Sequence, residues 1–209
     1  MELRYDKLGP KVVKALESRF FEAWYFSETG EAVDKVFSLI PKTDTVSWGG
    51  SLTTQGLGLQ KMAVEKGYKV IDRDKAQSPE ERMELQRKAL LCDTFLTGTN
   101  AITEDGQLVN IDGAGNRVAA MSFGPKQVIV VAGMNKVCQT IMDAANRART
   151  IAGPANMQRF PNLKSPCSET GACADCLSPD SICTFIVRTR MCKPKGRIKL
   201  ILIGKDLGL

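Results

Sequence analysis

The stretch Leu91–Met121, LCDTFLTGTNAITEDGQLVNIDGAGNRVAAM, holds the pattern that decides the fold. It begins with a short apolar run, Thr94–Leu96, of the kind found in buried parallel strands. Glu104–Gln107 then gives a turn signal between two strand-like runs, so a hairpin is expected. Polar, glycine-bearing loops at Thr97–Asn100 and Asp112–Asn116 flank this hairpin. A stable fold does not require such a pair of loops, whereas a small anionic ligand would use them.

Four further apolar runs have the length and β-branched content of strands. They lie at Thr45–Trp48, Tyr68–Asp72, Gln127–Ala132 and Ile198–Ile203. Segments with apolar residues at helical spacing alternate with them, and we expect helices at Pro10–Phe26, Glu31–Ile40, Ser78–Leu91 and Arg117–Met121, and from Asn135 or Lys136 to Ile151, before a break at Gly153-Pro154. This alternation predicts an α/β fold with a mostly parallel sheet and helices on both faces.

A second glycine loop, Gly49-Gly50-Ser51, follows the strand Thr45–Trp48. Glycines at a strand-to-helix turn let backbone N–H groups face a ligand, and the Ser51 and Thr53 hydroxyls add donors. A plainer interpretation is that the glycines make the turn and Ser51 caps the following helix. Ligands gather at the carboxyl ends of parallel strands. We therefore expect this loop and Gly98-Thr99-Asn100 to share one pocket.

The composition narrows the class of protein. The 209 residues carry a net charge of +6 and contain no histidine, so imidazole catalysis and mixed Cys/His metal sites are excluded. The positive charge favours anionic metabolites, and with 3 Tyr and 2 Trp there is no alternation of basic and aromatic residues to favour nucleic acid. The charged start of the chain has no signal-peptide pattern, and no apolar run has the length of a membrane span. These features predict a cytoplasmic protein.

Four cysteines near the end of the chain form a separate motif. Cys167, Cys173, Cys176 and Cys183 have the spacing C-x5-C-x2-C-x6-C. Thiols this close in a reducing compartment indicate a metal site. A compact four-thiolate loop with a single C-x2-C pair favours a [4Fe–4S] cluster over zinc, which usually has two such pairs, and metal-free thiols are the third interpretation. We expect an α/β domain of residues 1–164 and 184–209 with a cysteine-rich metal-binding insertion at residues 165–183.

With these motifs the sequence resembles the LUD (lactate utilisation domain) family, specifically its lactate-utilisation protein C type. The residues that carry the resemblance are Ser47–Ser51, Leu96–Gly106, Asn110–Gly113, Gly115–Met121, Gly124–Lys126, Val128–Asn135, Pro154–Asn156 and Pro166–Cys183. They cover nearly the whole chain. The resemblance implies a fold like that of the NagB/RpiA/CoA-transferase group, whose members bind sugar phosphates or acyl-CoA esters at glycine-rich strand ends. One departure is Thr53-Thr54-Gln55, where an acidic residue sometimes follows the glycine pair.

The family name comes from operons needed for lactate oxidation, in which partner subunits carry iron–sulfur clusters. The resemblance therefore implies a subunit of an L-lactate-oxidising iron–sulfur system. This subunit would bind a small anionic ligand and associate with other lactate-utilisation subunits. Self-association into an oligomer is also possible. Two alternatives stay open. The chain could be a stand-alone isomerase or transferase acting on a sugar phosphate or acyl-CoA, or a non-catalytic scaffold with a structural zinc.

The candidate site residues divide by role. Without histidine, the candidate general bases are Asp112 and Glu104; partial burial between the loops would suit Asp112, whose alternative is a turn residue bonded to backbone N–H groups. Arg117 is the candidate charge partner of the ligand. The full set of candidate ligand-binding residues is Gly49, Gly50, Ser51, Thr53, Gly98, Thr99, Asn100, Asn110, Asn116 and Arg117.

Overall fold

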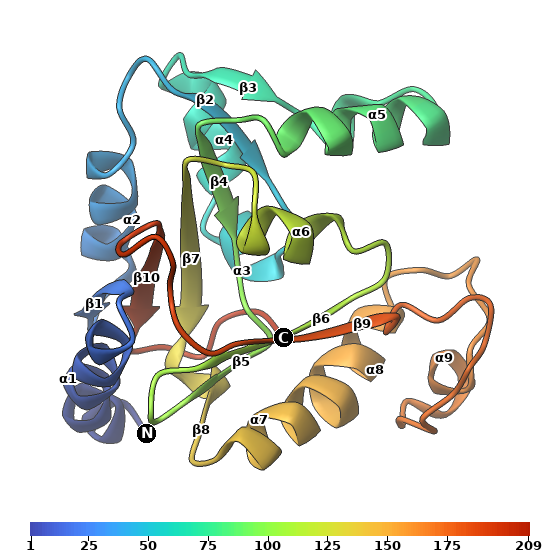
Figure 1. Ribbon diagram of the computed structural model, residues 1–209. Helices are drawn as coiled ribbons and strands as arrows, with labels where there is room; N and C mark the ends of the chain where they lie inside the picture. The colour runs from blue at the N-terminus through green and yellow to red at the C-terminus, as the bar shows by residue number, and fades with distance from the viewer.

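A six-stranded parallel sheet forms the centre of the computed structural model, which describes residues 1–209 (Figure 1). Every neighbouring pair of strands in it runs parallel, so the predicted α/β class with a mostly parallel sheet is confirmed. From edge to edge the strands are β1 (Glu22–Phe26), β10 (Ile198–Ile203), β7 (Gln127–Gly133), β4 (Thr94–Thr97), β2 (Thr45–Trp48) and β3 (Lys69–Ile71).

The run of β-branched residues in β7 is buried on both faces of this sheet. Val128 and Val130 belong to one apolar cluster, whereas Ile129 and Val131 belong to another on the opposite face. All four side chains are fully buried, and each contributes roughly 1.5–3 kcal/mol by leaving water. Burial on both sides is why this strand reads as a continuous apolar run and not as an alternating one.

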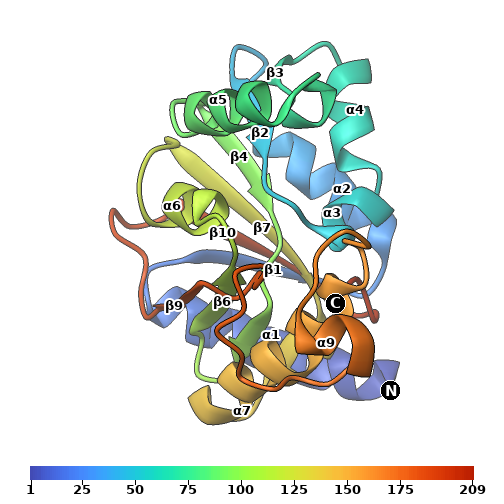
Figure 2. The same ribbon diagram turned by 90° about the vertical axis from the view of Figure 1, so that its right-hand side faces the viewer.

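Helices cover the two faces. Helix α1 (Glu2–Ser18) packs Val12 and Leu16 into the cluster on one face. Helices α2 (Thr29–Ser38) and α4 (Leu59–Glu65) contribute to the cluster on the other face. The remaining helices are α3 (Leu52–Gly56), α5 (Pro79–Ala89), α6 (Asn116–Ser122), α7 (Ile141–Arg147), α8 (Gly153–Met157) and α9 (Pro166–Thr170). In both ribbon views α5 and α7 lie at opposite ends of the molecule (Figures 1 and 2). None of the helices combines the length and apolar character needed to cross a membrane.

A second, smaller sheet contains the predicted hairpin. Its strands, in order, are β8 (Val137–Cys138), β5 (Ala101–Thr103), β6 (Leu108–Asp112) and β9 (Phe185–Thr189). The hairpin turns at Gly106, whose φ is +86° and whose Cβ, if present, would lie 2.6 Å from the backbone of Ala15 in α1. Only glycine fits there without strain. Strand β9 was not expected from the sequence, because three of its five residues are too exposed to give an apolar pattern.

The predicted opening helix Pro10–Phe26 is wrong at both ends. Helix α1 already begins at Glu2 and ends at Ser18, and Pro10 lies within it on the exposed side. Residues Glu22–Phe26 are strand β1, which pairs with β10 along its whole length. Pairing with a buried central strand outweighs the helical spacing of the apolar residues in this segment.

The predicted helix from Asn135 or Lys136 to Ile151 also starts too early. Residues Met134–Lys136 form a single 3-10 turn, followed by β8, and α7 begins only after Thr140. Thr140 and Asp143 form a capping box, in which each side chain accepts a hydrogen bond from the other residue's backbone N–H. Gly153-Pro154 does not end the helical run, because the π-helical turn Ala148–Ala152 leads directly into α8. Pro154 takes a first-turn position of α8, where no N–H is needed.

The order of the strands places a switch point between β2 and β4. From β2 the chain moves outward to β3, whereas from β4 it moves in the other direction to β7 and β10. At such a reversal the loops leaving the two adjacent strands diverge and leave a crevice beyond their carboxyl ends. The two strands concerned are the ones that lead into Gly49 and Gly98.

Candidate functional site

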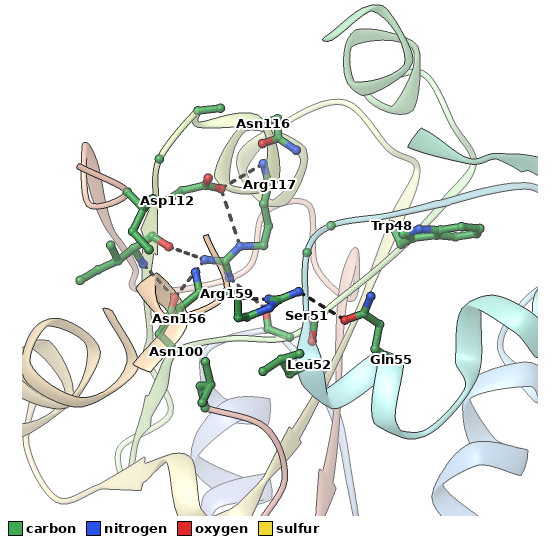
Figure 3. Close-up of a pocket in the computed structure, with 18 of the residues that line it drawn as sticks. Trp48, Ser51, Leu52, Gln55, Asn100, Asp112, Asn116, Arg117, Asn156 and Arg159 are labelled. Atoms are coloured by element: carbon green, nitrogen blue, oxygen red, sulfur yellow. Dashed lines mark hydrogen bonds and ion pairs between the residues drawn. The ribbon is translucent and has the colours of Figure 1, made fainter. Parts of the chain in front are cut away.

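The two glycine loops that follow β2 and β4 touch each other. The Gly49 N–H donates to the Leu96 carbonyl at 3.0 Å, which extends the strand pairing into the loop. A Cβ on Gly98 would lie 2.6 Å from Ser51 Oγ, so only a residue without a side chain lets the loops approach this closely. Both loops line one pocket with a volume of about 350 Å³, within the range of small-molecule sites (Figure 3).

Basic side chains outnumber acidic ones around this pocket. Its wall contains five basic and two acidic residues: Arg73, Arg82, Arg117, Arg159, Lys136, Asp74 and Asp112. The remaining polar wall is made largely of amides and backbone. A concave surface with this excess of positive charge attracts anions.

Ser51 has two functions available to it. Its Oγ accepts a hydrogen bond from the Thr54 N–H at 3.3 Å, so it caps α3 as the plainer interpretation proposed. Its own hydroxyl proton has no acceptor in the protein, and the residue lines the pocket. Ser51 can therefore cap the helix and still donate to a ligand.

Arg73 is the basic residue nearest to the Gly50 loop. Its Nη2 atom lies 2.9 Å from the place that a Gly50 Cβ would occupy, and its side chain is only 12% exposed. Its Nε is buried without a hydrogen-bond partner, and the carboxylate of Asp74 is 3.8 Å away from that atom. Burial lowers the pKa of this guanidinium, although an arginine stays charged in a protein. Arg73 therefore brings a positive charge, through its Nη2, next to Gly50.

Asp74 is already occupied by other partners. It accepts hydrogen bonds from Trp48 Nε1 at 3.0 Å and from Arg82 Nη2 at 3.1 Å. These donors and the neighbouring arginines hold the pKa of the Asp74 carboxyl below its usual value, against the effect of burial. Asp74 therefore balances Arg82 and leaves Arg73 without a close hydrogen-bonded counterion.

Arg159 reaches into the pocket beside Ser51 and next to amide side chains (Figure 3). Its Nη1 donates to Asn156 Oδ1 at 3.1 Å and its Nη2 lies 3.5 Å from Gln55 Oε1. Both partners are neutral, so the positive charge of Arg159 is not cancelled by a bonded carboxylate. Its guanidinium can turn toward an anion in the pocket at little cost.

Arg117, the predicted charge partner, is bonded to the protein instead. Its Nη1 donates to Gly98 O and Asn110 Oδ1, and its Nη2 donates to Asn100 Oδ1 and Ile111 O, at 2.5–3.3 Å. The residue is 9% exposed. Because each terminal nitrogen already has two acceptors, Arg117 ties together the loop after β4 and the strand β6. It shapes the pocket rather than offering free donors to a ligand.

The two candidate general bases have different surroundings. The oxygens of Asp112 accept hydrogen bonds from the backbone N–H groups of Gly115, Arg117 and Val118, and Oδ2 lies 3.7 Å from Arg117 Nε. This is the turn-residue arrangement that was the alternative for Asp112. Glu104 lies in the hairpin turn and does not line the pocket. Neither carboxylate is placed freely in the cavity as a base.

Not every other candidate ligand-binding residue reaches the cavity. Asn100 and Asn116 line it, and Asn100 Oδ1 accepts from the Ile111 N–H at 2.9 Å. Thr99 lines it as well, but its hydroxyl is directed at backbone carbonyls. Thr53 and Asn110 lie behind the wall, the first bonded to the backbone of Leu207 and the second to Arg117. Whether the lining residues bind a ligand stays a prediction.

The four predicted metal ligands lie half-buried near one another. Burial raises the pKa of the Cys183 thiol, and the neighbouring Cys167, Cys173 and Cys176 raise it further. The segment that holds the first three consists of α9 and irregular loops. No group of three or more Cys, Asp or Glu side chains is arranged as a set of metal ligands. The donor chemistry suits a thiolate site, but the structure contains no ready-made coordination geometry.

The strongest basic contributors to the pocket were missed in the sequence. Arg73 follows the edge strand β3 and Arg159 follows α8, so neither lies next to a glycine loop in the chain. Lys136 was taken as the start of a helix. Arg73 reaches the cavity from the end of β3, Lys136 from the end of β7 and Arg159 from the chain after α8, so only the tertiary structure brings them together.

Comparison with known proteins identifies solved structures and a protein family that are similar to this chain. A DUF162 family protein from Deinococcus radiodurans superposes with a TM-score of 0.56 at 12% identity, covering 95% of this chain and 97% of that one. Ribose 5-phosphate isomerase A from Neisseria gonorrhoeae is similar over 54% of each chain, with a TM-score of 0.36 and 15% identity. No curated protein matches the chain. The LUD domain matches residues 9–203, so this chain belongs to the LUD domain family.

Proposed function

We propose that the pocket at the β2/β4 switch point binds a small metabolite that carries at least one carboxylate or phosphate group. The observation that carries the proposal is the arrangement around Gly50. Arg73 places its Nη2 beside this loop, 2.9 Å from the position of a Gly50 Cβ, and Ser51 has a hydroxyl proton without an acceptor. Buried polar groups are normally hydrogen-bonded, so these donors favour an acceptor that comes from outside the protein.

A second arginine supplies the second contact. Arg159 is bonded only to neutral amides, one of them Gln55 in the helix after the glycine loop, and Asn100 and Asn116 also line the pocket. Charge-assisted hydrogen bonds from guanidinium groups to a carboxylate or phosphate are about twice as strong as neutral ones. The two arginines beside the glycine loop and the amide side chains of the wall suit a ligand with one anionic group and further polar groups.

Binding of inorganic sulfate, followed by calorimetry at low ionic strength, tests the pocket. We expect Arg73→Gln and Arg159→Gln each to weaken sulfate binding about tenfold or more, because each removes a charge-assisted hydrogen bond worth roughly 1.5–3 kcal/mol. The matched control is Arg188→Gln. Arg188 donates to Gln107 at 2.6 Å in the second sheet, outside the pocket, and its loss is expected to leave binding unchanged. Equal weakening in all three variants would mean that sulfate responds only to net charge.

We further propose the finer assignment that the resemblance implies: a lactate-utilisation protein of the C type, acting as a subunit of an L-lactate-oxidising iron–sulfur system. Membership of the LUD domain family supports this proposal. The two carboxylates expected to act as bases in a stand-alone isomerase are not free in the cavity, since Asp112 accepts backbone hydrogen bonds and Glu104 lies outside the pocket. Association with iron–sulfur partner subunits of such a system is the expected outcome of a co-purification experiment.

The four cysteines are proposed as ligands of a thiolate-bound metal centre, with a [4Fe–4S] cluster ahead of zinc. Their mutual proximity around Cys183 supports this proposal. When bound, such a cluster supplies one-electron transfer. Protein purified without oxygen is expected to contain about four iron atoms per chain, and a Cys173→Ser/Cys176→Ser variant is expected to contain none. Zinc at one atom per chain would support the scaffold alternative, and absence of both metals would leave four free thiols.

A further inference from the structure

Lys136 is a buried lysine on the wall of the pocket. The proposed anion-binding contacts do not account for it. It ends the 3-10 turn after β7 and is 3% exposed. Its Nζ donates one hydrogen bond, to Thr53 Oγ1 at 2.9 Å. It forms no ion pair with a carboxylate. Buried lysines are usually paired, so this one is unusual.

The charged side chains that act on Lys136 are the cations Arg147 of α7 and Arg117 of α6. Helix α3 contributes the neutral Thr53 hydroxyl, and a Cβ built on Gly208 of the C-terminal segment would lie 3.4 Å from Lys136 Nζ. The two acidic residues of the pocket are engaged elsewhere, Asp74 with Trp48 and Arg82, and Asp112 with Arg117 and backbone N–H groups. Burial and the two arginines lower the pKa of Lys136 to about 7. A large share of this amine is therefore uncharged at neutral pH.

We propose that Lys136 is a nucleophilic amine that condenses with the carbonyl group of an anionic aldehyde or ketone held in the pocket. The inference rests on the proposed function, because the arginines and Ser51 would hold the anionic group of that ligand. Lysines that form Schiff bases are activated in this way, by desolvation or by neighbouring cations. An amine that only attracted the anion would be more effective if it stayed charged at neutral pH.

The step is balanced without a further reactant. The lone pair of the neutral amine attacks the carbonyl carbon, and the C=O π electrons move to the oxygen, which takes the proton released from nitrogen. The resulting carbinolamine loses its hydroxyl as water together with the second N–H proton. One C=N bond thus replaces one C=O bond, and one water molecule is released. No oxidation or reduction takes place.

Reductive trapping tests the proposal. The full chain is incubated at pH 7.5 with glyoxylate and sodium cyanoborohydride, which reduces the imine to a stable amine, and the adducts are located by peptide mass spectrometry. We expect one predominant adduct per chain, at Lys136. Sulfate in excess is expected to suppress it, and propionaldehyde, which has no charge, is expected to give at least tenfold less.

Two variants serve as controls. Lys136→Met is expected to lose the adduct while keeping its far-ultraviolet circular dichroism and its cooperative urea unfolding, which shows that it is folded. Lys199→Met removes a partly buried lysine that is paired with Glu22 at 3.0 Å. This variant keeps Lys136 and is expected to form the Lys136 adduct to the same extent as the unmodified protein. Adducts spread over many lysines, or labelling that persists in Lys136→Met, would overturn the inference.

Failure of the inference and failure of the proposed function give different results. If sulfate binds but glyoxylate does not label Lys136, the anion pocket stands and the nucleophile is rejected. If sulfate does not bind, the proposed function fails and the inference fails with it. Calorimetry with sulfate does not depend on the amine reaction, so the two results are obtained separately.

Discussion

Replacing Arg117 by methionine is expected to lower the free energy of unfolding by about 3–5 kcal/mol, the range observed when one partner of a buried charged network is removed. Methionine fills most of the same volume but donates no hydrogen bond. The carbonyl oxygens of Gly98 and Ile111 and the amide oxygen of Asn110 would each lose a donor in a buried place. A buried acceptor left without any donor, as Asn110 Oδ1 would be, costs about 1–3 kcal/mol.

Urea unfolding followed by circular dichroism measures this effect. The matched variant is Arg117→Lys, which keeps the charge but has a single ammonium in place of the planar fork, and we expect it to recover less than half of the loss. A second readout is sulfate binding, which is expected to weaken because the loop after β4 is no longer held to β6. A loss of stability below about 1 kcal/mol would show that other contacts hold these loops together.

Replacing Lys136 by methionine is expected to raise the free energy of unfolding, by an amount that depends on pH. The pKa of Lys136 is lowered from 10.5 to about 7 in the folded protein. Between these two values the unfolded chain binds a proton that the folded protein does not, so the stability of the unmodified protein rises as the pH is raised through this window. Below pH 7 the folded protein must carry a buried, unpaired charge, and the full penalty applies.

The methionine variant has no such penalty. It is expected to be more stable than the unmodified protein below pH 7, by at most roughly 5 kcal/mol, since each pKa unit corresponds to 1.36 kcal/mol. The gain is expected to shrink as the pH approaches 10. Denaturant unfolding at several pH values measures it, with Lys199→Met as the control that keeps Lys136. A gain that does not change with pH would indicate better packing rather than relief of a buried charge.

Several parts of the fold were predictable because their sequence signals agree with their surroundings. β7 and β10 are uninterrupted apolar runs, and strands buried on both faces require this pattern. The hairpin has its glycine at the one turn position with positive φ, and Ser78-Pro79 marks the start of α5 correctly. Strand β1 was missed because successive residues pack into the clusters on opposite faces of the sheet, so the strand shows no alternation of apolar and polar residues. The spacing of the apolar residues in this segment also suits a helix.

The candidate site was predictable only where a loop directly follows a strand. Gly49–Ser51 and Gly98–Asn100 line the cavity, as the rule for carboxyl ends of parallel strands predicts. The role expected of Arg117 differs from its contacts, since a sequence does not reveal whether a guanidinium meets a ligand or backbone carbonyls. The same holds for Asp112, whose oxygens accept backbone hydrogen bonds.

The amino-acid sequence alone determined the class of fold, the two glycine loops, the absence of imidazole chemistry and the position of the four cysteines. These features depend on residues close together in the chain. The tertiary structure alone decided which charges face the cavity: Arg73, Arg159 and Lys136 come from separate segments and meet there. It also decided which of them stay unpaired, because desolvation and pairing depend on neighbours that are distant in sequence. The electrostatic character of the site therefore arises from the packing of these segments against one another.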